Sequence, residues 1–304
     1  MSIRFRIWPF TVAALLLAAL GTGLYFDLRP RYKTAAEIVS LLPKSDAIVF
    51  YADVGRLRAG GILGGLEGAK GTEEQDYQRF VADTGFSYER DLDAIAVASV
   101  PDQVFAVLRG RFDWQRLRAY AKRQNGNCSG DYCRLPASTP GRSISFLPVR
   151  SDVMAFAISP DANAAYNLLP RRGAPLSQVP SYVVWAQIPK RILDKPDSLP
   201  PAVQIFARAL SSTSAVTLGV DGSPANEFTL KLLAQCESDK QADLVRQHLA
   251  QLTEMLRSML ARGNRPPDEI PIGNVLTSGT FRSEKHQIAG EWRIPVALVD
   301  SLLH

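Results

Sequence analysis

Three carboxylates lie close together in this sequence, at Glu89, Asp91 and Asp93. Two carboxyl groups that face one cleft can act as general acid and general base when their surroundings separate their pKa values, and three can bind a cation. The simpler interpretation is that they are solvated charges before the apolar strand expected at 94–100. We favour this second interpretation, and we predict no catalytic residue here.

The other motifs that could support catalysis are incomplete. A glycine-rich stretch at 60–72 follows an expected strand, but alanine and glycine flank its lysine where a phosphate-binding loop needs Gly-Lys-Ser or Gly-Lys-Thr. The sequence contains no Gly-x-Ser-x-Gly elbow. Metal-ligand spacing is also missing among the histidines, which are His248, His286 and His304. We therefore expect no cofactor and no metal site, and we favour a protein that is not an enzyme.

Two of the three cysteines, Cys128 and Cys133, lie in a turn-rich stretch at 125–133. A disulfide between them would close a short loop and would persist in an oxidising compartment. The alternative is a pair of unpaired thiols, since a metal site would need different spacing and a nearby histidine. Cys236 is interpreted as a small buried residue at a strand end. The pair favours a soluble domain in the periplasm or another extracytoplasmic compartment.

Basic residues gather at the end of one expected strand and on the helix that follows it, at 113–124. Two of them share one outer face of that helix. The candidate patch for an anionic surface consists of Arg109, Arg111, Arg116 and Arg123. It could contact lipid head groups or an acidic partner, or it could be an ordinary solvated face. Aromatic residues do not alternate with these cations, so we expect no nucleic-acid binding.

A long helix is predicted from Asp239 to Ala261, with Ser238 as its cap and Gly263 after its end. Its apolar residues recur at helical spacing. The stripe consists of Val245, Leu249, Leu252, Leu256 and Met259. This stripe could cover the sheet, or it could pair with a protein partner or with a second copy in a homo-oligomer.

The first 33 residues predict a membrane anchor. No charge occurs from Trp8 to Phe26, a run of about 20 residues, which is enough to span a bilayer. Trp8 and Tyr25 suit the two lipid interfaces. The alternative is a signal peptide cleaved after the small residues at 19–21. Because the numbers of basic residues before and after the span are nearly equal, charge does not fix the orientation of the span. We predict a retained, single-pass signal-anchor in a bacterial inner membrane.

The chain after the anchor repeats the same order of expected strands and helices at an offset of roughly 120 to 135 residues. Strands are expected in the first half at 47–54, 94–100, 104–111, 143–149 and 153–158. Strands are expected in the second half at 182–188, 215–220, 227–235, 275–281 and 287–294. This order predicts an α+β fold in two similar subdomains, each an antiparallel sheet with helices on one face. We place an anchor and connector at 1–33, subdomain 1 at 34–176 and subdomain 2 at 177–304. The repeated order indicates an internal duplication; the alternative is that short strands resemble one another by chance.

One short segment resembles a known group of proteins. The entry Leu42-Pro43-Lys44-Ser45-Asp46-Ala47 into an apolar strand, soon after a membrane anchor, is similar to the start of various uncharacterised, membrane-anchored exported bacterial proteins. The resemblance implies location and carries no chemistry with it.

The leading hypothesis is a single-pass, membrane-anchored extracytoplasmic module that binds or scaffolds without catalysis. Its small-molecule ligand is left unspecified by the sequence. The first alternative is a hydrolase that acts on the cell envelope, with its site in the groove between the two subdomains. The second alternative is a subunit of an envelope assembly that uses the long helix or the basic patch as its contact.

Overall fold

The computed structural model describes residues 34–43, 46–61, 73–170, 179–195, 201–222, 228–262 and 275–294. All of them belong to one compact unit, Thr34–His304. The expected anchor at 1–33, most of the glycine-rich stretch and residues 171–178 at the expected boundary between the two subdomains lie outside the described residues. Within the described ranges, no helix has both the length and the apolar character needed to cross a bilayer.

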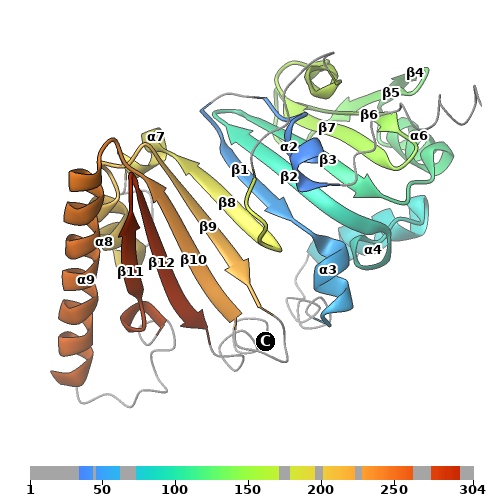
Figure 1. Cartoon of the computed structure of the whole chain (residues 1–304). Coiled ribbons are helices and arrows are strands. Elements are labelled where there is room, and N and C mark those ends of the chain that lie inside the picture. The colour runs from blue at the N-terminus through green and yellow to red at the C-terminus, as the bar shows by residue number, and fades with distance from the viewer. Residues whose placement is uncertain are drawn as a thin grey trace, which may run out of the picture. The chain divides into compact units, whose positions relative to one another are not determined.

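The strands of the described residues form one antiparallel sheet in the order β11-β12-β10-β9-β8-β1-β2-β3-β7-β6-β5-β4 (Figure 1). The strands of the first half are β1 (Ile48–Ala52), β2 (Leu92–Val100), β3 (Gln103–Gly110), β4 (Asn127–Ser129), β5 (Tyr132–Pro136), β6 (Ser143–Arg150) and β7 (Val153–Ser159). Those of the second half are β8 (Val184–Pro189), β9 (Ala215–Asp221), β10 (Phe228–Gln235), β11 (Thr280–Glu284) and β12 (Gln287–Ile294). The α+β class predicted from the sequence is confirmed.

The two halves meet at the centre of the sheet. Strands β1 and β8 pair antiparallel there, with Phe50 opposite Ala186. From this pair the strands run outward as β1-β2-β3-β7-β6 in one half and as β8-β9-β10-β12-β11 in the other. The first half continues with β5 and β4. The halves therefore share one continuous sheet, whereas the sequence predicted a separate sheet in each.

One strand differs from its expected position. The sequence predicted a strand at 275–281 with a turn at 282–284, but 275–277 is helical and β11 begins at Thr280. The turn into β12 falls at Lys285, which has a left-handed φ of 53°. Polar residues on the exposed side of this edge strand resembled a turn in the sequence.

Helices lie on both faces of the first half of the sheet. Its helical segments are α2 (Ala35–Val39), α3 (Val54–Ala59), α4 (Glu73–Thr84), α5 (Tyr88–Asp91), α6 (Trp114–Arg123) and η2 (Ala164–Leu168). Adjacent residues of a strand point to opposite faces. On β5, Cys133 packs in one core cluster with Leu117 of α6, whereas the Tyr132 ring stacks on Tyr166 of η2. Helices on one face were expected, and this is wrong for the first half because strands such as β7 are apolar at consecutive positions and need cover on both sides.

The second half has its main core on one face of the sheet. Its helices are α7 (Lys190–Leu193), α8 (Pro201–Ala209) and α9 (Asp239–Arg262). The helix α9 contributes Val245 and Leu249 to a cluster with Val216, Leu232 and Ile288 of the sheet. These strand residues are all even-numbered and lie on one face. The odd-numbered residues of the same strands therefore lie on the opposite face.

Candidate functional site

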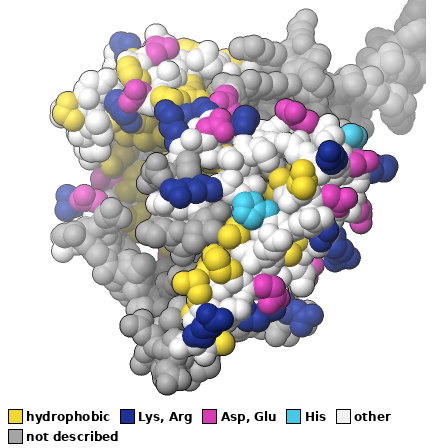
Figure 2. Space-filling model, turned by 90° about the vertical axis from the view of Figure 1, so that its left-hand side faces the viewer, with side chains coloured by type: hydrophobic (Ala, Val, Ile, Leu, Met, Phe, Trp, Pro, Cys, Tyr) yellow, Lys and Arg dark blue, Asp and Glu magenta, His cyan; other side chains and the backbone are white. Residues whose placement is uncertain are grey.

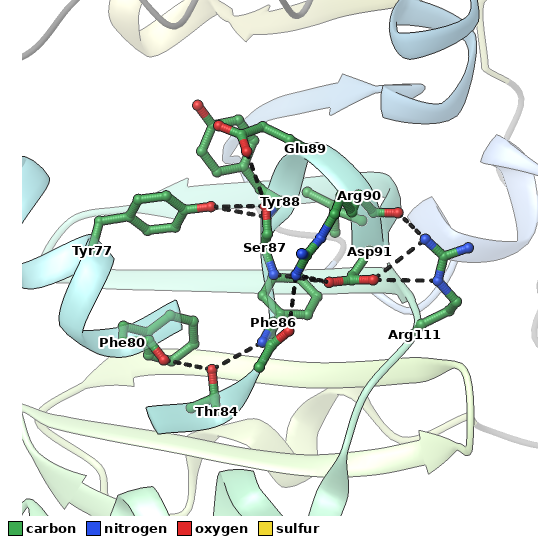
Figure 3. A network of polar contacts seen from close by, with 12 residues as sticks. Tyr77, Phe80, Thr84, Phe86, Ser87, Tyr88, Glu89, Arg90, Asp91 and Arg111 are labelled. Atoms are coloured by element: carbon green, nitrogen blue, oxygen red, sulfur yellow. Dashed lines mark hydrogen bonds and ion pairs between the residues drawn. The ribbon is translucent and has the colours of Figure 1, made fainter. Parts of the chain in front are cut away.

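The carboxylate of Asp91 is held by cations and a backbone amide (Figure 3). Its Oδ1 accepts from Arg111 Nε at 3.3 Å, and its Oδ2 accepts from the Ser87 backbone N–H at 3.0 Å. Burial raises the pKa of Asp91, but the hydrogen bonds from Ser87 and Arg111 and the charges of Arg90 and Arg111 outweigh it, so the pKa lies below its ordinary value. This carboxyl group stays ionised and is unsuited to act as a general acid.

The three predicted carboxylates do not converge on one cleft. Glu89 accepts from Ser87 Oγ at 3.1 Å, and Asp93 faces Arg58 at 3.6 Å. The Tyr77 hydroxyl extends the network by accepting from the Tyr88 backbone N–H at 3.1 Å. Figure 3 shows the contacts of Ser87, Tyr88 and Glu89 around the short segment between α4 and β2. The network therefore fixes a chain connection, and the described residues contain no group of three side chains that could hold a metal ion.

Replacing Asp91 with asparagine is expected to lower the free energy of unfolding by about 1.5 kcal/mol near neutral pH, because hydrogen bonds to an ionised group are lost. The folded pKa lies below the ordinary 3.8, so this stabilisation is full above that value and is lost as the pH falls through the lower folded pKa. The difference between wild type and variant therefore shrinks in acid. Urea unfolding of both proteins from neutral to acidic pH measures this difference in stability. A difference that is independent of pH would contradict the lowered pKa of Asp91.

A matched control is Asp76, whose carboxylate faces Arg79 at 3.5 Å but is 83% exposed. Replacing Asp76 with asparagine is expected to change the free energy of unfolding by at most about 0.5 kcal/mol.

The predicted basic patch carries carboxylates beside its arginines. Arg111 faces Asp91 at 3.3 Å, and Arg116 and Arg123 face Asp113 at 3.6 Å and Asp83 at 3.1 Å. The fourth residue, Arg109, lies on β3, and its charge lowers the pKa of Tyr51 against a larger rise from burial. A hollow of about 600 Å³ is lined by both Asp91 and Arg111 and by both Asp113 and Arg116. Charge on this surface is therefore mixed.

A second hollow lies on the sheet face opposite to α9. It has a volume of about 620 Å³, within the range of small-molecule sites. Its floor includes Val49, Gln187, Thr217 and Leu233, which lie side by side in the register of β1, β8, β9 and β10. The end of α2 and the segment before β8 form its walls. These wall residues are Val39, Leu42, Pro43, Val179 and Pro180.

Trp185 is the most informative residue of this hollow. Its side chain is 3% exposed, and its ring stacks on Tyr51 with 5.7 Å between ring centroids. The Trp185 Nε1–H has no hydrogen-bond acceptor in the structure. A buried donor left unpaired costs about 1 to 3 kcal/mol, so this N–H is an exception among buried polar groups. Trp185 did not stand out in the sequence, because a tryptophan in an apolar strand has the same pattern as an ordinary core residue.

The long helix uses most of its predicted stripe within the domain. Val245 and Leu249 are buried, and Leu252 and Leu256 pack against the same core. Only Met259 of the five is exposed, at 61%. The helix also exposes Leu244 and Met255, at 57% and 46%. Figure 2 shows hydrophobic side chains in a band among charged ones on the side of the molecule that carries α9.

The predicted cysteine pair is bonded. A disulfide joins Cys128 of β4 to Cys133 of β5, which are opposite each other in the strand register. Cys236 is buried with a free thiol, and burial raises its pKa.

Comparison with known proteins identifies a fold and no family. No family model matches the chain, and no curated protein matches it. Crystal form III of TP0453 aligns with a TM-score of 0.50 at 12% identity, over 88% of this chain and 97% of that chain. Crystal form I of TP0453 aligns with a TM-score of 0.46 at 12% identity, over 89% and 99% of the two chains. At this identity the likeness concerns the fold alone.

Proposed function

We propose that this chain is a single-pass, membrane-anchored module whose soluble part lies in the periplasm or another extracytoplasmic compartment and binds a ligand without catalysis. The observation that carries the binding role is the hollow on the sheet, where the buried Trp185 N–H lacks an acceptor. A preformed concave site with few polar groups is typical of ligand binding.

The location rests on two further features. The apolar run from Trp8 to Phe26 has the length of a membrane span. The disulfide between Cys128 and Cys133 is a bond that oxidising compartments preserve. The resemblance of the segment at 42–47 to exported bacterial proteins agrees with both.

The domain arose, in this proposal, by internal duplication into subdomains at 34–176 and 177–304. The support is the outward strand order, which is the same from β1 to β6 as from β8 to β11 once the inserted β4 and β5 are set aside. The hollow lies next to the seam between the two halves, because its floor includes residues of both β1 and β8.

The hydrolase alternative, whose candidate residues are Glu89, Asp91 and Asp93, gains no support from their contacts. Asp91 forms an ion pair with Arg111, and Asp93 forms one with Arg58.

The assembly alternative is supported by one specific observation, the exposed Leu244, Met255 and Met259 of α9. If this face holds a partner copy or another subunit, glutamate at both methionines will dissociate the complex in gently extracted membranes, and an unchanged particle mass will exclude it.

Membrane attachment is tested by fractionation of cells that produce the full chain. Alkaline carbonate should leave the full chain in the membrane pellet, because a spanning helix resists extraction. A version with 1–33 replaced by a cleavable signal peptide should appear in the soluble fraction with an unchanged melting temperature, since the compact unit begins at Thr34. A full chain released by carbonate, or shortened by about 20 residues at its N-terminus, would contradict the retained anchor.

A further inference from the structure

The outer surface of α9 carries large apolar side chains that face solvent. Leu244, Met255 and Met259 are three of the six large hydrophobic residues that are exposed in the described part of the chain. Met255 lies eleven residues after Leu244, close to three turns of ~3.6 residues, and Met259 follows about one turn later. The three therefore form one band along the helix, which we call the outer band (Figure 2). A contiguous apolar band on a soluble surface indicates a contact.

The charges of α9 disfavour a lipid surface as the occupant of the outer band. The helix has four basic and three acidic side chains, so its net charge is only +1. A helix that lies in the interface of an anionic membrane is typically rich in lysine and arginine on its polar face. Two exposed polar residues, His248 and Gln251, also lie within the band between Leu244 and Met255. A protein surface with matching polar groups suits this mixture better than hydrocarbon does.

The spacing of the outer band is self-complementary. Two copies can lay their α9 helices side by side in opposite directions, with a two-fold axis midway between Leu244 and Met255. The Leu244 of each copy then meets the Met255 of the other. The same axis sets His248 against Gln251, because each lies four residues inside its apolar neighbour. Apolar residues meet apolar residues in this pairing, and polar residues meet polar residues.

The two ends of the helix agree with the antiparallel direction. Four residues beyond the central pair, Met259 meets Lys240, whose aliphatic stem can cover an apolar side chain while its ammonium group stays in water. Seven residues beyond that pair, Arg262 meets Glu237, which carries the opposite charge. All four of these residues are exposed. A parallel pair would instead set Arg262 against Arg262 and Lys240 against Lys240, and like charges repel.

A hollow beside the outer band gives the second copy room for a side chain. It has a volume of about 420 Å³ and lies between α9 and β11. Its lining includes Gln251 and Glu254 of the helix and Thr280 and Phe281 of the strand. In the antiparallel pair, His248 of the second copy meets Gln251 at the edge of this hollow. The contact surface therefore extends from the band onto the neighbouring strand.

We propose that the outer band is a contact surface for a second copy of this chain, with the two α9 helices antiparallel across a two-fold axis. The inference goes beyond the proposed ligand-binding role, because α9 packs on the sheet face opposite to the hollow of β1, β8, β9 and β10. It rests on the proposed anchor. Three large apolar side chains per copy make a small contact, and two chains held in one membrane meet at a raised effective concentration.

Cysteine cross-linking of the full chain in isolated membranes tests this arrangement. Leu244→Cys and Met255→Cys are produced separately and together, and the membranes are oxidised with copper phenanthroline. The native cysteines do not interfere, because Cys128 and Cys133 are bonded and Cys236 is buried. Together the two variants should give a disulfide-linked species of about twice the 33.3 kDa of the chain. Each variant alone should stay at the mass of one chain, because the axis separates like residues by about 16 Å and a disulfide needs Cα atoms within about 7 Å.

Arg257→Cys is the matched control. Arg257 is exposed and lies two residues beyond Met255, on roughly the opposite side of the helix, where its guanidinium donates to the Thr277 carbonyl. Produced together with Leu244→Cys, this variant should give no linked species.

Three outcomes overturn the proposal. Linkage of Leu244→Cys to itself would show a parallel pair, and an absence of linkage in the mixture with Met255→Cys would exclude the second copy. Protection of both cysteines from a bulky water-soluble maleimide that modifies Arg257→Cys, again without linkage, would place the outer band on lipid. Carbonate extraction of the same membranes reports the anchor separately, so failure of the pairing is distinguishable from failure of the anchored-module proposal.

Discussion

Replacing Leu249 with alanine is expected to lower the free energy of unfolding by about 3 kcal/mol. Leu249 is fully buried in the cluster between α9 and the sheet, and its loss leaves a cavity. Leu244 lies on the same helix but is 57% exposed, so its replacement with alanine should change stability by at most about 0.5 kcal/mol. Denaturant unfolding of both variants measures the contrast.

This pair decides how the long helix is used. A large loss at Leu249 with none at Leu244 means that the predicted stripe covers the domain's own sheet. A small loss of stability in the Leu249 variant would contradict the packing of α9 against the sheet. It would instead favour a role for the apolar stripe in binding a partner.

Removing the disulfide is expected to have the next largest effect. A chain with Cys128→Ala and Cys133→Ala should be less stable by about 2 kcal/mol, because the bond restricts the unfolded chain around a short loop. A reducing agent should lower the stability of the wild type to that of the double variant and leave the variant unchanged. Equal stability of the oxidised wild type and the variant would show that the bond contributes nothing to the fold.

Local features of this fold were predictable from the sequence. Thr34 and Glu37 have the spacing of a capping box, and the structure contains it, with the Thr34 backbone N–H donating to Glu37 Oε2 at 2.8 Å. The turn-rich loop indicated the pairing of Cys128 with Cys133. Most strands also lie where apolar runs predicted them. In each case the deciding contacts are between residues close together in the chain.

The hollow depends on pairing between strands that lie far apart in the chain, which local sequence patterns do not show. Val49, Trp185, Thr217 and Leu233 come from four strands, and only the pairing of β1 with β8 brings them to one surface. No pattern within one strand specifies that pairing. The same limit explains Asp91 and Arg111, which were treated as separate candidates although they form one ion pair.

The anchored, extracytoplasmic placement of the domain is tested by a reporter fused to the C-terminus that is active only outside the cytoplasm, combined with a blot for the N-terminal segment. We predict an active fusion that keeps its first residues, as an anchored extracytoplasmic module requires. An inactive fusion would place the domain in the cytoplasm and would contradict the proposed extracytoplasmic module, because the Cys128–Cys133 bond would lose its oxidising surroundings.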